Sequence, residues 1–467
     1  MGGLSRVMNL AVVILAAGMG KRMKSDIPKV LHPVLGRPML SYLLDAVNNL
    51  SPKRVVLVVG HGAQDVKKIL DSKKITYVVQ TKQLGTGHAA NCAKSALKNF
   101  KGNILILNGD FPLITSSSLK KFMKDHEKKN ADLSILTALI DDPHGYGRIK
   151  RDQNGDVIGI VEEKDASREE RLIDEINSGT YCVKSSFLWN ALKKINSRNK
   201  QSEYYLTDIV KSAHKDSLKV NGVIVSDSDE VMGVNDRSEL SYVQSVLKWR
   251  INESLMRSGV TLIDPETTYI SPEVRIGRDT TIYPNTHIYG KTQIGRDCVI
   301  GPSTWIEDSK FGNRVTIRSS CCITNASINN NVNIGPFAHL RPEAQIMDGA
   351  KIGNFVEIKK SKIGPGSKVS HLSYVGDARL GKDVNIGAGT ITCNYDGFEK
   401  HKTVVEDNVF IGSDTMLVAP IKVGKGATTG AGSTISKDVP EGSLAIGRAR
   451  QIIIKDWKRN PKEKKRK

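Results

Sequence analysis

The stretch from Ile276 to Val439 decides the fold, because an aliphatic residue, often followed by glycine, returns in it at every sixth position. Its first part reads Ile276-Gly277, Ile282, Ile288, Ile294-Gly295, Ile300-Gly301 and Ile306, and its last part reads Ile411-Gly412, Leu417, Val423-Gly424, Thr429 and Ile435. A period of six differs from the 3.6 residues of a helix and the two residues of a strand. It is the period of a hexapeptide β-helix, in which short strands form the sides of a solenoid.

In such a solenoid the aliphatic residue points inward and stacks on its equivalents in neighbouring coils. Five-residue steps fit corner adjustments, and they occur at Ile306–Phe311, Ile323–Ile328, Ile358–Ile363 and Val375–Leu380. The alternative is a β-sandwich with evenly spaced strands, which so many hexads in register disfavour. Residues 392–408 interrupt a late coil and are too long for a corner, so they are expected to form a loop with a functional role.

The length of 467 residues suggests two or three domains. Hydrophobic residues make up 39% and charged residues 25%, as in soluble globular proteins. The N-terminal apolar run leads directly into a glycine-rich basic loop, so we interpret it as a strand and not as a signal peptide. We find no apolar run long enough for a membrane span, and no paired cysteine motif among the six cysteines. We therefore expect a cytoplasmic protein with reduced thiols.

The net charge of +20 favours anionic partners. Much of it lies in the tail 455–467, KDWKRNPKEKKRK, which we expect to be disordered. Nucleic-acid binding would require basic residues interleaved with aromatic residues, and aromatic residues make up only 5% of the chain. Phosphorylated small molecules explain the charge at least as well.

A glycine-rich loop follows the buried strand predicted at residues 11–17. It begins at Gly18 and is followed by the basic residues Lys21, Arg22 and Lys29, which can neutralise a triphosphate. The loop lacks the third glycine of a dinucleotide fingerprint and the Gly-Lys-Ser/Thr ending of a Walker loop. Alone it indicates a phosphate site only weakly, and an ordinary tight turn is the alternative.

Further strands alternate with helices in the first half of the chain. Strands are predicted at Arg54–Val59, Ile75–Val79 and Asn103–Leu107, and helices near Met39–Leu50, His88–Lys98 and Ser117–Lys129. This rhythm predicts a doubly wound, Rossmann-like parallel sheet with ligands at the carboxyl ends of its strands. Asp110 follows the most apolar strand and is a candidate Mg²⁺ ligand, the alternative being a cap of a turn or helix.

From Asp236 onward the pattern becomes helical, with a capping box formed by Asp236 and Glu239 and a stop at Gly259. This pattern predicts four segments. They are an α/β domain at 1–236, a connecting helix at 237–259, a left-handed parallel β-helix at 260–454 and the basic tail at 455–467.

Several long motifs resemble one known family. LAAGMGKRM at 15–23 with Pro28-Lys29 resembles sugar-nucleotide pyrophosphorylases in general. The second half resembles only the bacterial bifunctional N-acetylglucosamine-1-phosphate uridyltransferase/glucosamine-1-phosphate acetyltransferases. The motifs that carry this are FAHLRPEA at 337–344, GNFVEIKKSKIG at 353–364, HLSYVGDA at 371–378, NIGAGTITCNYDG at 385–397 and IGSDTMLVAP at 411–420.

For the first half, the resemblance implies uridylyl transfer from UTP to N-acetylglucosamine 1-phosphate, with Mg²⁺ held by Asp110 and Asn235. It implies a nucleotide-sugar site at Leu15, Ala16, Ala17, Gly18, Arg22, Lys29, Gln80, Gly85, Thr86, Asn108, Gly109, Asp110, Gly147, Glu162, Asn177 and Asn235. The family commonly has a tyrosine where this chain has Asn108, which puts any packing by an aromatic ring there in doubt.

For the second half, the resemblance implies acetyl transfer from acetyl-CoA to glucosamine 1-phosphate, with His371 as general base. An imidazole titrates near neutral pH, which suits this role. The implied sugar-phosphate and acetyl-CoA contacts are Arg341, Lys359, Tyr374, Asn385, Ala388, Asn394, Tyr395, Ser413, Ala431 and Arg448. The resemblance further implies a homotrimer formed through the β-helix, and a product, UDP-N-acetylglucosamine, that feeds peptidoglycan and lipopolysaccharide synthesis.

Two alternative interpretations are less consistent with the sequence. A single-activity pyrophosphorylase whose solenoid only assembles subunits is disfavoured by the joint presence of His371, Arg341, Lys359 and Asn394. A nucleic-acid-binding scaffold is disfavoured by the composition. We therefore expect small-molecule substrates and no nucleic-acid or membrane partner.

Overall fold

The computed structural model describes residues 9–70 and 72–458. The chain divides into two compact units, Met1–Leu247 and Lys248–Lys467, which are described separately below. Lys455–Lys458 form neither helix nor strand, and the remainder of the predicted basic tail, 459–467, lies outside the described residues. Within the described part of the chain, no helix has both the length and the apolar character that crossing a membrane requires.

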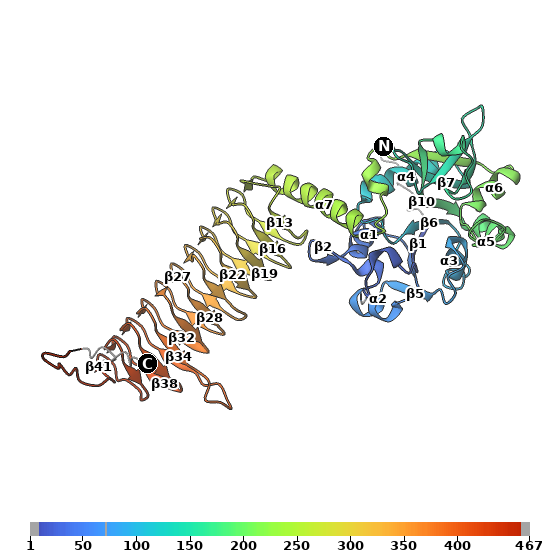
Figure 1. Ribbon diagram of the computed structural model, residues 1–467. Coiled ribbons are helices and arrows are strands. Elements are labelled where there is room, and N and C mark those ends of the chain that lie inside the picture. The colour runs from blue at the N-terminus through green and yellow to red at the C-terminus, as the bar shows by residue number, and fades with distance from the viewer. Residues whose placement is uncertain (1–8, 71, 459–467) are drawn as a thin grey trace, which may run out of the picture. The chain divides into compact units, whose positions relative to one another are not determined.

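The first unit is built on a mainly parallel sheet (Figure 1). In spatial order its central strands are β11 (Val220–Ile224), β7 (Leu133–Leu139), β10 (Glu175–Lys184), β6 (Asn103–Asn108), β1 (Leu10–Ala16), β4 (Arg54–Val59) and β5 (Ile75–Val79). Strand β1 pairs in parallel with both β4 and β6, whereas β10 runs antiparallel to β6 and β7. The hairpin of β8 (Gly147–Arg151) and β9 (Val157–Val161) joins β10 at the side.

Helices cover both faces of this sheet, as a doubly wound fold requires. They are α1 (Met39–Asn48), α2 (Ala63–Leu70), α3 (Thr86–Cys92), α4 (Ser116–Lys128), α5 (Ser185–Lys194) and α6 (Asp208–Lys215). Alternate residues of β1 enter two separate cores, Val12 and Ile14 on one face and Ala11 and Val13 on the other. The Rossmann-like prediction is confirmed. Helix α3 ends earlier than predicted, because the chain continues after Cys92 as a series of short hydrogen-bonded turns.

Among the described residues of the first unit, four short 3-10 helices and a two-stranded ribbon complete the fold. They are η1 (Lys21–Met23), η2 (Lys29–Leu31), η3 (Glu170–Leu172), η4 (Ser228–Val231), β2 (Pro33–Val34) and β3 (Arg37–Pro38). The first two 3-10 helices carry the basic side chains of the predicted phosphate loop.

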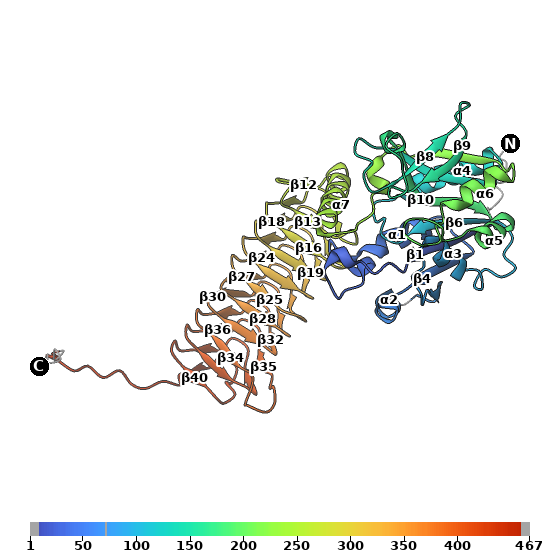
Figure 2. The same ribbon diagram turned by 45° about the vertical axis from the view of Figure 1, so that its right-hand side comes forward.

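The second unit is a solenoid of three parallel sheets, and its stacked coils are visible in Figure 2. The first sheet contains β12 (Thr261–Leu262), β15 (Thr281–Ile282), β18 (Val299–Ile300), β21 (Thr316–Ile317), β24 (Asn333–Ile334), β27 (Lys351–Asn354), β30 (Lys368–His371), β33 (Asn385–Ile386), β36 (Phe410–Ile411), β39 (Thr428–Thr429) and β41 (Leu444–Ala445). The second contains β13 (Tyr269–Ile270), β16 (His287–Tyr289), β19 (Trp305–Glu307), β22 (Cys322–Thr324), β25 (His339–Leu340), β28 (Glu357–Lys359), β31 (Tyr374–Gly376), β34 (Ile391–Cys393), β37 (Met416–Val418) and β40 (Thr434–Ile435). The third contains β14 (Arg275–Ile276), β17 (Gln293–Ile294), β20 (Lys310–Phe311), β23 (Ser327–Ile328), β26 (Gln345–Ile346), β29 (Lys362–Ile363), β32 (Ala378–Leu380), β35 (Thr403–Val405) and β38 (Ile421–Val423).

The hexad residues form the interior of the solenoid, as their spacing predicts. Ile282, Ile288 and Ile300 are fully buried and belong to one core that runs through all the coils. Each strand pairs with the strand one coil further along, so equivalent aliphatic residues stack directly, as Ile282 does on Ile300. The prediction of a left-handed parallel β-helix is confirmed.

The corners between strands take a left-handed backbone conformation at many non-glycine residues. Asp279, Asn285, Asp297 and Asn331 have φ angles of 62°, 57°, 57° and 59°. Asparagine and aspartate tolerate this region better than other residues with a Cβ, which explains their frequency at these corners.

The loop that interrupts the late coil is shorter than the predicted 392–408. Ile391–Cys393 forms β34 and Thr403–Val405 forms β35, and both strands pair within the solenoid. The excursion is therefore confined to residues 394–402. The prediction extended too far because Thr403 and Val405, both buried, continue the inward pattern without a glycine to mark it.

Helix α7 (Arg237–Arg257) is the predicted connecting helix, and the boundary between the two compact units falls inside it. Its second half covers the first coil of the solenoid, where Ile251, Leu255 and Met256 pack against the solenoid core. A solenoid needs such a cap because its terminal coil otherwise exposes core residues and unpaired backbone groups.

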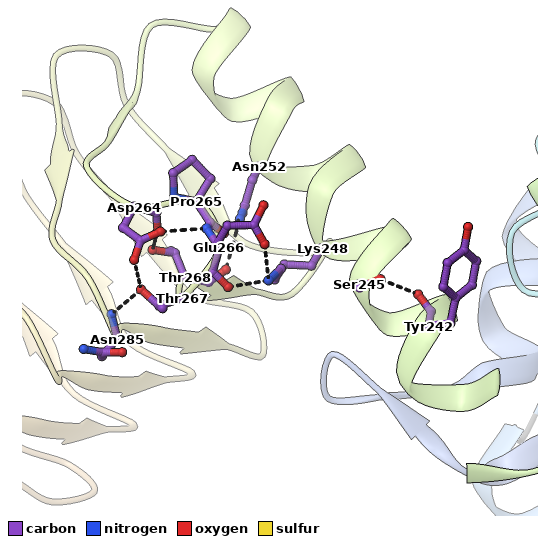
Figure 3. A network of polar contacts seen from close by, with 10 residues as sticks. All are labelled: Tyr242, Ser245, Lys248, Asn252, Asp264, Pro265, Glu266, Thr267, Thr268 and Asn285. Atoms are coloured by element: carbon purple, nitrogen blue, oxygen red, sulfur yellow. Dashed lines mark hydrogen bonds and ion pairs between the residues drawn. The ribbon is translucent and has the colours of Figure 1, made fainter. Parts of the chain in front are cut away.

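Polar contacts fix this cap (Figure 3). The buried Asn252 side chain donates through Nδ2 to the carbonyl oxygens of Pro265 and Thr268, at 2.9 and 3.0 Å. Lys248 donates to the Glu266 carbonyl oxygen and lies over the Tyr269 ring, with 5.0 Å between Nζ and the ring centroid. The loop between α7 and the second strand of the solenoid is thus tied to the helix.

We predict that Asn252→Leu loosens this first coil. The substitution leaves two backbone carbonyls without their donor, and each such loss costs about 1–3 kcal/mol. Amide hydrogen exchange in residues 261–289 should accelerate and the thermal transition of the second unit should fall. Ser245→Ala is the matched control, because the Ser245 hydroxyl bonds only within α7, to the Tyr242 carbonyl oxygen (Figure 3). Equal exchange rates in the Asn252 variant and the control would contradict the capping role.

Candidate functional site

A cavity of about 470 Å³ lies at the carboxyl ends of the parallel strands β1 and β6 in the first unit. Ten of the residues predicted for the nucleotide end line it: Leu15, Ala16, Ala17, Gly18, Lys29, Gln80, Gly85, Thr86, Asn108 and Asp110. Two other residues of the predicted nucleotide-sugar site, Arg22 and Gly109, do not line this cavity. Arg22 is exposed beside the loop, and Gly109 is buried, where an added Cβ would lie 2.9 Å from the Ala16 Cβ.

Buried hydrogen bonds shape one wall of this cavity. The Gln80 side chain, 5% exposed, donates through Nε2 to the Gly85 carbonyl oxygen at 3.2 Å and lies 2.9 Å from His88 Nδ1. Gly85 has a φ of 103°, and a Cβ there would lie 2.6 Å from the Tyr204 carbonyl oxygen, so only glycine fits. Gln83 Nε2 donates to the Ala17 carbonyl oxygen at 2.9 Å and so holds the start of the glycine-rich loop.

A second cavity of about 230 Å³ adjoins the first, and Thr86, Asn108 and Asp110 line both. The remaining predicted residues of the first unit, Gly147, Glu162, Asn177 and Asn235, line this second cavity. Strands β8 and β10 bring Gly147 opposite Asn177.

Glu162 is a partly buried carboxyl group in the second cavity. Burial raises its pKa, and the hydrogen bond from Thr207 Oγ1 to Oε1, at 3.0 Å, only partly opposes this. Tyr181, also buried, donates from its hydroxyl to Asn177 Oδ1 at 3.1 Å. The second cavity therefore presents hydrogen-bonding groups that suit the hydroxyls of a small polar ligand.

Lys29 connects the two cavities. Its Nζ donates to Asn235 Oδ1 at 2.9 Å and forms an ion pair with Asp110 Oδ2. Asp110 follows β6 and Asn235 precedes α7, so residues far apart in the sequence meet around one ammonium group.

Arg237, the first residue of α7, secures this arrangement. Its Nε donates to the Met23 carbonyl oxygen at 3.3 Å, and its Nη1 lies 3.2 Å from Nδ1 of the buried His32. Met23 ends η1 and His32 directly follows η2, the 3-10 helix that begins with Lys29. Burial lowers the pKa of His32 and the Arg237 charge lowers it further, so the imidazole is neutral at this contact.

The oxygens of Asp110 and Asn235 already converge on one cation, the Lys29 ammonium. A carboxylate and an amide oxygen are the hard ligands that Mg²⁺ prefers, and Mg²⁺ commonly completes its shell with water and phosphate oxygens. These two residues therefore fit Mg²⁺. Across the part of the chain that the structure describes, no group of three or more histidine, cysteine or acidic residues is arranged to hold a metal ion.

In the second unit, the predicted base lies on one corner of the solenoid. His371 ends β30 and is exposed, and it is in register with Asn354 of β27, one coil earlier. Ala388, Ser413 and Ala431 lie on the same corner in the coils that follow. Their places are given by the pairing of β30 with β33, of β33 with β36 and of β36 with β39. These three small residues form a row, here called the track, in the coils after His371. Neighbouring coils are roughly 4.8 Å apart.

Asn354 orients the imidazole. Its Oδ1 lies 2.6 Å from His371 Nδ1, and an amide oxygen can only accept, so Nδ1 carries the proton and Nε2 has the free lone pair. Sequence reasoning assigned no role to Asn354. It lies one coil before His371, so counting coils from the base would have found it.

Several basic side chains lie close together near the second sheet of the solenoid. Arg341 forms a 2.7 Å ion pair with Glu357, which is in register with Tyr374. Lys400, from the loop at 394–402, lies close to Lys359, and this neighbouring cation is the main cause of a lowered pKa of Lys359. Arg341 lowers that pKa further. Such a cluster suits a phosphate group, whose charge would relieve the repulsion.

The loop at 394–402 is ordered by its own contacts. Asp396 accepts hydrogen bonds from the Glu399 and Phe398 backbone N–H groups and pairs with His401 at 2.6 Å, and these contacts hold its pKa well below the usual range. Lys400 pairs with Tyr395 across the hairpin. Lys400 was missed from the sequence, where only the basic character of the loop signalled it.

The other predicted residues fall in three places. The buried Asn394 donates to Asp377 and lies 3.5 Å from the Tyr374 hydroxyl, so it belongs to the cation cluster. Tyr395 is 60% exposed on the loop, and Arg448 is exposed after β41, beyond the last coil. Asn385 faces outward from the first sheet, whereas Arg341, Lys359 and Tyr374 belong to the second, so one chain does not bring them together.

Two families match the two units. The nucleotidyl transferase family matches residues 11–249. The bacterial transferase hexapeptide family, described by six repeats, matches residues 273–308, 325–360 and 402–437.

Relatives match nearly the whole chain. The bifunctional protein GlmU of Geotalea uraniireducens is 50% identical over 451 residues, covering 96% of this chain and 99% of the relative. The bifunctional protein GlmU of Caldanaerobacter subterraneus subsp. tengcongensis is 52% identical over 448 residues, covering 96% and 97%. That of Thermosipho africanus is 51% identical over 449 residues, with the same coverage.

We predict that Lys400→Met raises the pKa of Lys359, because a neighbouring cation is removed. An NMR titration of the labelled lysine side chains measures this, with the Lys359 signal assigned by its loss in Lys359→Arg. Lys402→Met, in the same loop, is the control and should leave that pKa unchanged. An unchanged Lys359 titration in Lys400→Met would show that the two side chains do not interact in solution.

Proposed function

The chain belongs to the family of bifunctional GlmU proteins, and we propose that its two units carry out successive transfers that yield UDP-N-acetylglucosamine. The solenoid transfers an acetyl group from acetyl-CoA to glucosamine 1-phosphate. The α/β unit transfers uridylyl from UTP to the resulting N-acetylglucosamine 1-phosphate and releases pyrophosphate. The observation that carries this division is that the Lys29 cluster and the His371 cluster lie in different compact units.

In uridylyl transfer, an oxygen of the sugar phosphate attacks the α-phosphorus of UTP as the bond to the pyrophosphate oxygen breaks. The larger cavity takes the nucleotide and the smaller one takes the sugar, so the reacting atoms meet near Asp110, which lines both. Phosphoryl transfer depends on alignment and charge neutralisation more than on a covalent protein group. The carboxyl of Glu162 and the amide of Asn177 orient the sugar through its hydroxyls.

Lys29 supplies positive charge at the meeting point of the two cavities. Asp110 and Asn235 would hold Mg²⁺, which when bound neutralises the charge of the phosphate groups. The Lys29 ammonium contacts the same two oxygens, so binding of the ion there would free Lys29 to contact the phosphate groups.

In acetyl transfer, the sugar amine attacks the thioester carbonyl carbon, the C–S bond breaks and the CoA thiol leaves. Nε2 of His371 accepts the proton from the amine, while Asn354 holds Nδ1–H and keeps the base in the correct tautomer. Arg341, Lys359 and Lys400 bind the sugar phosphate. The track of Ala388, Ser413 and Ala431 accommodates the extended acetyl-CoA, with Arg448 available for its phosphates.

The active assembly is a homotrimer of parallel solenoids. Its support is that Asn385 faces outward from the first sheet while the cation cluster lies on the second. A second copy standing alongside brings one face against the other, and a threefold ring is the closed arrangement of such contacts. The reactions take place in the cytoplasm, and the product supplies peptidoglycan and lipopolysaccharide synthesis.

The domain assignment follows from the same argument. We assign uridylyl transfer to 1–236 and acetyl transfer to 260–454, with α7 as the connection. The side chains discussed for each reaction fall within these ranges.

We predict that Asp110→Ala and His371→Ala separate the two activities. Loss of a general base lowers a rate by about 10²–10⁴-fold, so His371→Ala should abolish CoA-thiol release with glucosamine 1-phosphate. Pyrophosphate release from UTP and N-acetylglucosamine 1-phosphate should persist in that variant. Asp110→Ala should show the reverse pattern. Loss of both activities together in either folded variant would contradict the assignment of two independent sites.

We predict that Asn354→Asp shifts the pH dependence of acetyl transfer. A carboxylate beside the imidazole stabilises its protonated form, so a base that acts when neutral needs a higher pH to become active. The acidic limb of the pH–rate profile should move to higher pH, with activity recovered above it. Asn354→Ala should instead lower kcat about 10-fold at all pH values without moving the limb. An unmoved limb in Asn354→Asp would rule out the orienting contact.

A further inference from the structure

A fully buried arginine is the direct neighbour of a residue that lines the second cavity of the α/β unit. Arg148, on β8, is only 2% exposed and is among the largest fully buried side chains of the described residues. Its Nη2 lies 2.8 Å from Glu163 Oε2. Neither residue lines the cavity, although their neighbours Gly147 and Glu162 both do. A buried guanidinium carries a large desolvation penalty unless its charge is balanced. Glu163 balances the charge here, although Arg148 Nε has no hydrogen-bond partner among the described residues.

These two side chains hold both ends of the short loop that forms one wall of the cavity. Arg148 Nη1 donates to the Tyr146 carbonyl oxygen, and the Gly145 backbone N–H is close enough to the Glu163 carboxylate to lower its pKa. Burial by itself raises the pKa of Glu163, but Arg148, the Gly145 N–H and Arg171 together outweigh it and lower that pKa. Glu163 is therefore ionised. Arg171 Nε lies 3.4 Å from Glu163 Oε1 on the solvent side.

The strand register connects the ion pair of Arg148 and Glu163 to residues that line the cavity. Arg148 is opposite Val161 on β9, so Glu162 and Glu163 directly follow the paired residue. Gly147 is opposite Asn177 on β10. A Cβ added to Gly147 would lie 3.3 Å from Glu162 Oε2, which shows how closely the loop and the carboxyl group pack. The relative position of Gly147 and Glu162 thus depends on the ion pair behind them.

We propose that Arg148 and Glu163 are positioning residues for the sugar phosphate in uridylyl transfer. The pair fixes the loop of Gly145, Tyr146 and Gly147 against Glu162, and so sets the shape of the sugar cavity without touching the substrate. This inference rests on the proposed function of the α/β unit. None of the residues that the pair contacts lines the nucleotide cavity, so its effect is confined to one of the two substrates.

The test is the steady-state kinetics of Glu163→Gln, which keeps the shape of the side chain and removes the charge. Full-length variants are assayed for pyrophosphate release with each substrate varied in turn. We expect the KM for N-acetylglucosamine 1-phosphate to rise at least about 10-fold, while the KM for UTP changes less than about 2-fold. Arg148→Lys, which keeps a charge but loses the fork of N–H donors, should show a smaller shift of the same kind.

A matched control lies on the same strand. Arg151, three residues after Arg148, pairs with Glu175 at 2.7 Å, and neither residue contacts the loop or lines a substrate cavity. Glu175→Gln should leave both KM values within about 2-fold of the wild type. Acetyl transfer by the solenoid, measured on the same samples, and thermal unfolding of the α/β unit report whether each variant is folded.

The outcomes separate this proposal from the function on which it rests. A wild-type enzyme that makes no UDP-N-acetylglucosamine overturns the proposed function and the positioning role with it. An active wild type with an unchanged sugar-phosphate KM in folded Glu163→Gln overturns the positioning role alone. An equal rise of both KM values in Glu163→Gln, or in the Glu175→Gln control, shows general destabilisation and likewise overturns it.

Discussion

The stacking of inward aliphatic residues in the solenoid is the constraint on which the acetyltransferase site depends. Because one residue in each hexad is fixed in the core, the direction of every other residue in that hexad is fixed as well. Asn354, His371, Ala388, Ser413 and Ala431 share a corner only because their coils stay in register. A rigid, repetitive core thus builds a linear site from residues spread over nearly eighty positions of sequence.

The α/β unit uses a different constraint for the same purpose. Parallel strands direct their carboxyl ends to one edge of the sheet, where Leu15 to Gly18 and Asn108 to Asp110 emerge side by side. Lys29 and Asn235 reach that edge from η2 and from the start of α7. Contacts from Arg237 and from the ion pair of the buried Arg148 with the partly exposed Glu163 set the geometry of the two cavities from behind.

The two sites differ in how the positive charge of their lysine is balanced. Around Lys29, oxygens of Asp110 and Asn235 balance the ammonium. Around Lys359, the neighbouring cations Lys400 and Arg341 are only partly balanced, and the pKa of Lys359 falls. A phosphate group bound at the second cluster would relieve this repulsion.

The periodic and local features of this protein are predictable from its amino-acid sequence. The six-residue repeat predicted the solenoid, the apolar run before Gly18 predicted β1, and the capping pattern at Asp236 and Glu239 predicted α7, since each depends only on near neighbours along the chain. Motif resemblance brought together most residues of the candidate sites. The tertiary structure alone decided the roles of Asn354, Lys400, Arg148 and Glu163, and it shortened the loop to 394–402. These depend on contacts between coils and between strands distant in sequence, and a linear pattern carries no signal for a partner whose distance is set by packing.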